Sequence, residues 1–157
     1  MKGLYISIFV LGTFLANAQS NLYSKLNSYL TTQTKEVTTD RLIAINVWSA
    51  ADKNSRDLNT EFEKAYSTYE YAKLKGGNKG IIVLNVSIDN DGVKANITAK
   101  KDGVTKSISV PNDSEIVKEL KGKSSGYNIV FDSNGNKVFE NLTTGTVFNS
   151  IHQLITR

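Results

Sequence analysis

Two continuous apolar runs, each long enough for one buried strand, limit the folds open to this chain. Residues 42–48 and 81–88 are mostly apolar and rich in β-branched side chains, as is typical of strands covered on both faces. The segment between them carries one apolar stripe at helical spacing, made of Leu58, Phe62, Ala65, Tyr66 and Tyr69. We therefore expect two parallel strands joined by a right-handed helical crossover.

The first 18 residues predict a cleaved signal peptide. Lys2 supplies a positive start, residues 4–15 form a short apolar run, and residues 16–18 (Ala-Asn-Ala) have the small-residue pattern of a cleavage site. The alternative, a transmembrane anchor, needs about 20 apolar residues. No cysteine follows the cleavage site, which excludes a bacterial lipoprotein. We expect an exported bacterial protein, periplasmic or secreted, with no membrane span in the mature chain.

The chain has no cysteine among its 157 residues, which excludes thiol chemistry and disulfides. Its fold must therefore be stabilised by its core alone. The net charge is +4, or +3 once the segment with Lys2 is removed. Lysines cluster at residues 73–79 and 118–123 without interleaved aromatic side chains, so we expect no nucleic-acid partner. These clusters are interpreted as solvated faces, with binding of an anionic partner as the alternative.

The remaining segments predict short elements around the two strands. Residues 21–31 have the spacing of an amphipathic helix, followed by a polar connector. Residues 92–101 fit a strand or a helix, and their place after a strand favours a helix. Residues 107–110 predict a short extended piece, and Ser114 can cap a brief helix after it.

The crossover helix and the C-terminal part have recognisable boundaries. Asp52 or Ser55 can cap the crossover helix, and Gly76-Gly77-Asn78 is expected to end it. An Asn-Gly linker between residues 127–131 and 137–140 predicts a β-hairpin. Apolar side chains from Val147 to Ile155 predict a final helix. Together these elements predict an α/β fold with a mixed central sheet and helices on both faces.

Three segments carry a family resemblance. They are residues 46–50 (Asn-Val-Trp-Ser-Ala) with Arg56 after them, residues 82–89 (Ile-Val-Leu-Asn-Val-Ser-Ile-Asp), and residues 129–138 (Ile-Val-Phe-Asp-Ser-Asn-Gly-Asn-Lys-Val). In this order the segments resemble the thioredoxin fold, and more narrowly the exported TlpA/ResA-like thiol-disulfide oxidoreductases. The resemblance spans roughly residues 40–155. It implies a thioredoxin-like three-layer sandwich over residues 41–157, preceded by an N-terminal helix and connector over residues 19–40.

The chain departs from this family where the family's chemistry lies. The resemblance aligns the attacking cysteine of the Cys-x-x-Cys motif with Asp52, the resolving cysteine with Ser55, and the cis-proline with Gly126. Disulfide exchange needs a thiolate, its resolving partner and a substrate-docking loop. We therefore expect no thiol-disulfide oxidoreductase activity, no cofactor and no metal.

The residues at these positions have structural and functional interpretations. Asp52 is interpreted as a helix cap, with ligand or metal binding as the alternative. Trp48 is either a core residue or part of an exposed partner-binding surface. Ser55 would need a base to act as a nucleophile, and the only histidine, His152, lies in the last helix, which in the family packs away from the site.

We predict a redox-inactive, exported domain that binds a protein or peptide. The predicted binding surface comprises Trp48, Asp52, Ser55 and Gly126. Two alternatives stay open. One is a structural or accessory protein of the bacterial envelope that uses a lysine-bearing surface, such as that of Lys118 and Lys121, and the other is an enzyme with chemistry that does not involve thiols.

Overall fold

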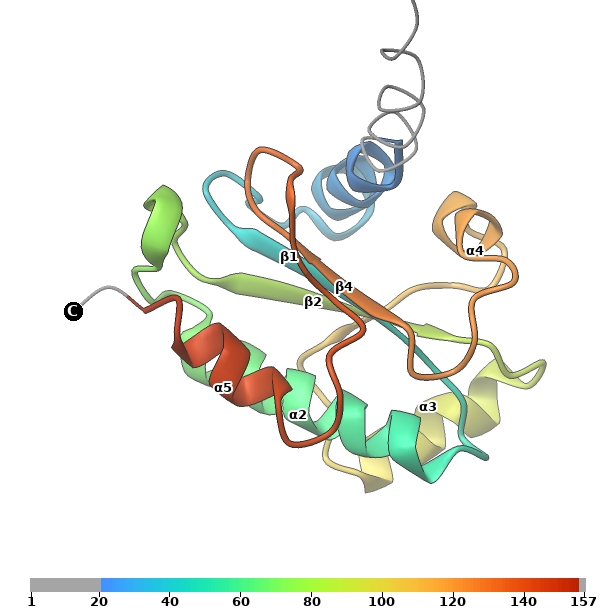
Figure 1. Ribbon diagram of the computed structural model, residues 1–157. Coiled ribbons are helices and arrows are strands. Elements are labelled where there is room, and N and C mark those ends of the chain that lie inside the picture. The colour runs from blue at the N-terminus through green and yellow to red at the C-terminus, as the bar shows by residue number, and fades with distance from the viewer. Residues whose placement is uncertain (1–20, 156–157) are drawn as a thin grey trace, which may run out of the picture.

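A computed structural model describes residues 21–155 and shows a five-stranded sheet between two layers of helices (Figure 1). The strand order is β3-β2-β1-β4-β5. The predicted signal peptide, residues 1–18, lies outside the described residues. Among residues 21–155, no helix is both long enough and apolar enough to cross a membrane.

The two apolar runs form the centre of the sheet, as predicted. β1 (Leu42–Trp48) and β2 (Ile81–Ser87) pair in parallel, and every residue of β1 is buried. α2 (Lys53–Tyr69) connects them and packs its apolar stripe against both strands. Because each central strand is covered on both faces, every position in it needs a side chain that tolerates burial.

Shorter elements complete the sheet and its helical layers. In chain order they are α3 (Gly92–Lys101), β3 (Ile108–Ser109), α4 (Glu115–Glu119), β4 (Asn128–Phe131), β5 (Lys137–Glu140) and α5 (Val147–His152). The helical interpretation of residues 92–101, the Ser114 cap and the β4–β5 hairpin are confirmed. β4 runs antiparallel to β1, so the sheet is mixed, also as predicted.

Helices cover both faces of the sheet (Figure 1). α2, α3 and α5 lie on one face, and the N-terminal helix (residues 21–29) and α4 lie on the other. Leu22, Leu26 and Leu30 are buried in the same core as β1. Burial of a leucine side chain contributes about 2 kcal/mol, so this helix helps to stabilise the sheet. The division of the chain at residue 40 stays a prediction.

The predicted end of the crossover helix was wrong. α2 ends at Tyr69 and not at Gly76-Gly77-Asn78. The Nη2 group of Arg41 donates to the carbonyl of Glu70 at 3.0 Å, which satisfies one of the acceptors left free at the helix end. Gly80 then passes so close that a Cβ there would lie 1.8 Å from the same carbonyl oxygen. The Gly-Gly pair instead lies in a later turn, η2 (Lys75–Gly77), across which Lys73 and Lys79 form an antiparallel bridge.

Two other helix boundaries also differ from the prediction. The N-terminal helix continues as a π-helical turn over Leu30–Thr34, where a loop was expected, and ends at Lys35 in the left-handed conformation. The last helix ends at His152, short of Ile155. The carbonyl of Leu154 accepts from the N–H of Lys75 at 2.6 Å, so this tail pairs with the segment before β2.

Candidate functional site

Asp52 caps the first turn of α2, directly after β1 and a short loop. Its Oδ1 accepts from the N–H of Asn54 at 3.0 Å, and its Oδ2 accepts from the hydroxyl of Ser125 at 2.6 Å. The hydrogen bond from Ser125 is the main reason that the pKa of Asp52 lies below its usual value, although burial opposes the change. Asp52 is thus a stable anion that joins α2 to the loop before β4.

Ser55 and Trp48 lie beneath the surface. Ser55 is fully buried, and its hydroxyl donates to the carbonyl of Asp52 at 2.9 Å and accepts from the N–H of Ser49 at 3.1 Å. Trp48 is 2% exposed and packs against α3. The structure therefore decides the alternative for Trp48 in favour of the core. Neither side chain can therefore contact a partner directly, and each can only pack beneath the residues that form the surface.

Gly126 lies beside the end of β1, next to the Asp52 cap. Its N–H donates to the carbonyl of Val47 at 2.7 Å, and its φ of 91° lies in the left-handed region that favours glycine. The peptide bonds of the described residues are all trans. The main-chain N–H and C=O of Ser125 have no hydrogen-bond partner within residues 21–155. This loop therefore offers a free donor and a free acceptor next to the carboxylate of Asp52.

A groove of about 510 Å³ opens beside Ser125 and Gly126, and we call it the Gly126 groove. Its lining residues are Asn54, Leu58, Ser124, Ser125, Gly126, Tyr127, Asn141, Leu142, Thr143 and Thr144. None of these side chains is charged at neutral pH. The groove thus combines amide and hydroxyl groups with a few apolar side chains, as suits an uncharged polar chain.

Asp89 fastens the loop after β1 to the end of β2, a contact that the sequence analysis missed. Its Oδ1 accepts from the hydroxyl of Ser49 at 2.8 Å, and its Oδ2 accepts from the N–H of Ala50 at 2.7 Å and the hydroxyl of Ser87 at 2.9 Å. Burial opposes ionisation, but these donors outweigh it, so the pKa of Asp89 lies below its usual value. The contact depends on the parallel register that places Trp48 beside Ser87.

Buried asparagines form a polar row across the sheet. The strand register places Asn46 of β1 between Asn85 of β2 and Asn128 of β4, and the side-chain amide of Asn46 donates to Asn59 of α2. Oδ1 of Asn46, Nδ2 of Asn59 and Oδ1 of Asn85 have no hydrogen-bond partner in the described part of the chain. Amides do not titrate at neutral pH, so this row supplies no general acid or base.

The structure also excludes a serine–histidine pair. Ser55 lies in the first turn of α2, whereas Nδ1 of His152 lies 2.8 Å from the hydroxyl of Tyr69 at the last residue of α2. The two ends of this helix are roughly 20 Å apart. Residues 21–155 contain no group of three or more histidine, aspartate or glutamate residues placed to hold a metal ion.

Solved structures share this fold. The thioredoxin domain of a Bacteroides vulgatus thiol-disulfide oxidoreductase aligns with a TM-score of 0.60 and 14% identity, over 76% of this chain and 82% of that chain. A Bacteroides fragilis thiol-disulfide oxidoreductase gives 0.53 and 19%, over 73% and 81%. A secreted Mycobacterium tuberculosis disulfide oxidoreductase gives 0.59 and 7%, over 74% and 84%. The predicted thioredoxin-like fold is thus confirmed. No family model and no curated protein matches the sequence.

Proposed function

We propose that this chain is a redox-inactive thioredoxin-like domain that binds an extended polypeptide segment in the Gly126 groove. Thiol-disulfide exchange requires a thiolate, and the whole chain lacks cysteine. The strand, loop and helix to which the family resemblance assigns the Cys-x-x-Cys motif are nevertheless present, with Asp52 at the helix start. We propose binding, and not catalysis, as the use of this surface.

The observation that carries the proposal is the free main-chain pair of Ser125 beside an uncharged groove. An extended peptide pairs its own N–H and C=O groups with such a free edge, and neighbouring pockets receive its side chains. Asn54, Asn141 and Thr144 are exposed and line the same groove. Their neutral polar groups suit a peptide backbone, whereas an ionic ligand would find no counter-charge among the lining side chains.

The proposed setting is the bacterial envelope or the exterior. Residues 1–18 have the pattern of a signal peptide, and one of the similar structures is described as a secreted protein. When the full chain is produced in a bacterial host, we expect the periplasmic or secreted product to begin at Gln19. Mass spectrometry of that product tests this. Recovery of an uncleaved cytosolic protein would contradict export.

Peptide binding can be tested with an array of unstructured peptides and the purified protein. Thr144→Arg places a long cation in the neutral groove, and we expect it to abolish binding of the peptides that the unchanged protein retains. Thr60→Arg is the matched control, because Thr60 is exposed on α2 outside the groove. Equal binding by both variants, or no peptide retained by the unchanged protein, would refute the proposed function.

Redox inactivity has its own test. The purified protein should reduce insulin no faster than the buffer with dithiothreitol alone, because no residue of the chain can form a mixed disulfide. Faster insulin reduction that copurifies with the protein would overturn the redox-inactive part of the proposal. The peptide-array result would not be affected.

A further inference from the structure

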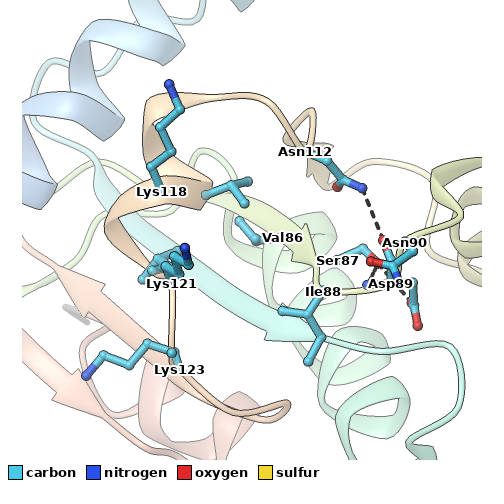
Figure 2. A pocket seen from close by; sticks show the side chains of 12 residues that line it. Val86, Ser87, Ile88, Asp89, Asn90, Asn112, Lys118, Lys121 and Lys123 are labelled. Atoms are coloured by element: carbon cyan, nitrogen blue, oxygen red, sulfur yellow. Dashed lines mark hydrogen bonds between the residues drawn. The ribbon is translucent and has the colours of Figure 1, made fainter.

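A second pocket, of about 570 Å³, lies between the C-terminal end of β2 and α4. Figure 2 shows Lys118, Lys121 and Lys123 along one wall and the main chain around Asp89, with Asn112, along the opposite wall. We call it the lysine pocket. It shares no lining residue with the Gly126 groove.

The charged groups of the lysine pocket are unbalanced. Within residues 21–155, Asp89 is the one acidic residue that lines it, and its carboxylate already accepts hydrogen bonds from Ser49, Ala50 and Ser87. Three lysines therefore line the pocket against one carboxylate that already accepts three hydrogen bonds. An anion entering the pocket would meet an excess of positive charge and no free acidic side chain.

The three lysines differ in their availability. Lys118 pairs with Glu115 at 2.6 Å, but both side chains are about two-thirds exposed, and such pairs contribute little. Lys123 lies 4.3 Å from the ring centre of Tyr127. The main-chain N–H of Lys121 donates to Lys118, but its side chain makes no ion pair, hydrogen bond or ring contact with the described residues. Lys121 is thus the cation that can bind a ligand without breaking an existing contact.

Apolar residues also contribute to the lining of the pocket. Val86, Ile88, Val117 and Leu120 contribute side chains to its lining. Ile88 is 48% exposed, although it directly follows β2, whose aliphatic side chains are all buried. In Figure 2, Val86 and Ile88 lie between the lysines and the segment around Asp89. A ligand that covered Ile88 would remove apolar surface from water and gain free energy.

We propose that the lysine pocket binds an organic anion in which a carboxylate is attached to an apolar chain. The carboxylate contacts Lys121, and the chain covers Ile88 and Val117. A free fatty acid and a peptide that ends in an apolar residue share this chemistry. The proposal does not depend on the use of the Gly126 groove, because the two sites have separate linings.

The test is a titration of the ¹⁵N-labelled protein, followed by NMR. The probes are octanoate and N-acetyl-glycyl-leucine, with octanol and the leucine amide of the same peptide as their uncharged counterparts. We expect saturable shifts of the amide signals of residues 86–90 and 117–123 with one or both acids. The acid that binds more tightly identifies the source of the ligand. Thr144→Arg should leave this binding unchanged.

Variants separate a specific site from general charge attraction. Lys121→Gln should weaken binding of the acid about tenfold, as expected for loss of one hydrogen bond between charged groups. Lys100→Gln is the matched control, because Lys100 is exposed on α3 across the sheet. Ile88→Ser should also weaken binding. Equal effects of the two lysine variants, equal binding of the uncharged counterparts, or no shift in these residues would overturn the proposal.

Discussion

Glu63 of α2 offers the sharpest test of how this fold is held together. It is 7% exposed, and its carboxylate accepts from the N–H groups of Thr105, Lys106 and Ser107 at 2.9, 2.6 and 2.8 Å. The hydroxyl of Ser107 donates to it as well, at 2.6 Å. One side chain thus satisfies three consecutive backbone donors and fastens the segment before β3 to α2.

The substitution Glu63→Gln keeps the size of the side chain but replaces one acceptor oxygen with a donor. Both oxygens are in use, so at least one backbone N–H of Thr105, Lys106 or Ser107 loses its acceptor. An unsatisfied buried donor costs about 1–3 kcal/mol, and the remaining bonds lose their charge assistance. We therefore expect the free energy of unfolding to fall by about 2–4 kcal/mol at neutral pH.

The effect of this substitution should depend on pH. Burial opposes ionisation of Glu63, but the hydrogen bonds from Ser107, Thr105 and Lys106 outweigh it, and its pKa lies below the ordinary value of 4.5. A carboxyl whose pKa is lowered by folding stabilises the fold above the unfolded pKa, and this stabilisation is lost as pH falls through the folded pKa. The difference between Glu63→Gln and the unchanged protein should therefore shrink in acid.

Urea unfolding followed by tryptophan fluorescence measures these differences. Trp48 is the only tryptophan and packs in a small cluster with Val104, next to the segment that Glu63 holds. Glu115→Gln is the control, because Glu115 is two-thirds exposed and its ion pair should contribute less than about 1 kcal/mol. A loss for Glu63→Gln as small as that of the control, or one independent of pH, would refute the reasoning.

Four further substitutions, with Gly103→Ala as the comparison for Gly80→Ala, test the packing and one helix cap, each by urea unfolding. Gly80→Ala should lower the free energy of unfolding by about 3 kcal/mol or more, because the φ of Gly80 is 99° and the new Cβ would clash with the carbonyl of Glu70. Gly103→Ala also has a positive φ, but its Cβ would enter open space, so the loss should be only about 1 kcal/mol. Leu26→Ala should lower the free energy of unfolding by about 2–5 kcal/mol. Unchanged stability would show that the N-terminal helix does not stabilise the core. Asp52→Ala should cost about 1 kcal/mol through loss of the helix cap, and unchanged stability would contradict that role.

The candidate site could be predicted from the sequence only in part. The position of Asp52 at a helix start followed from a buried strand, a short loop and an apolar stripe in sequence order, which are all local signals. The unpaired main chain of Ser125 was not predictable, because it depends on where the loop before β4 lies against β1. The burial of Ser55 likewise carried no signal, because a serine in the first turn of a helix is as compatible with the surface. In the sequence, the lysine pocket was visible only as a cluster of charges, since Val86 and Ile88 reach it from β2 and the residues just after β2.

By itself, the sequence determined the central strands, the parallel crossover, the hairpin and the absence of thiol chemistry. These follow from residue composition and from periodicity over short stretches, where side-chain burial sets the pattern. Only the tertiary structure decided that α2 ends at Tyr69, that Trp48 is core, and that Glu63 and Asp89 each bind a distant loop. A polar side chain carries no local mark of its partner when that partner lies some 40 residues away. The fold alone brings them within hydrogen-bonding distance.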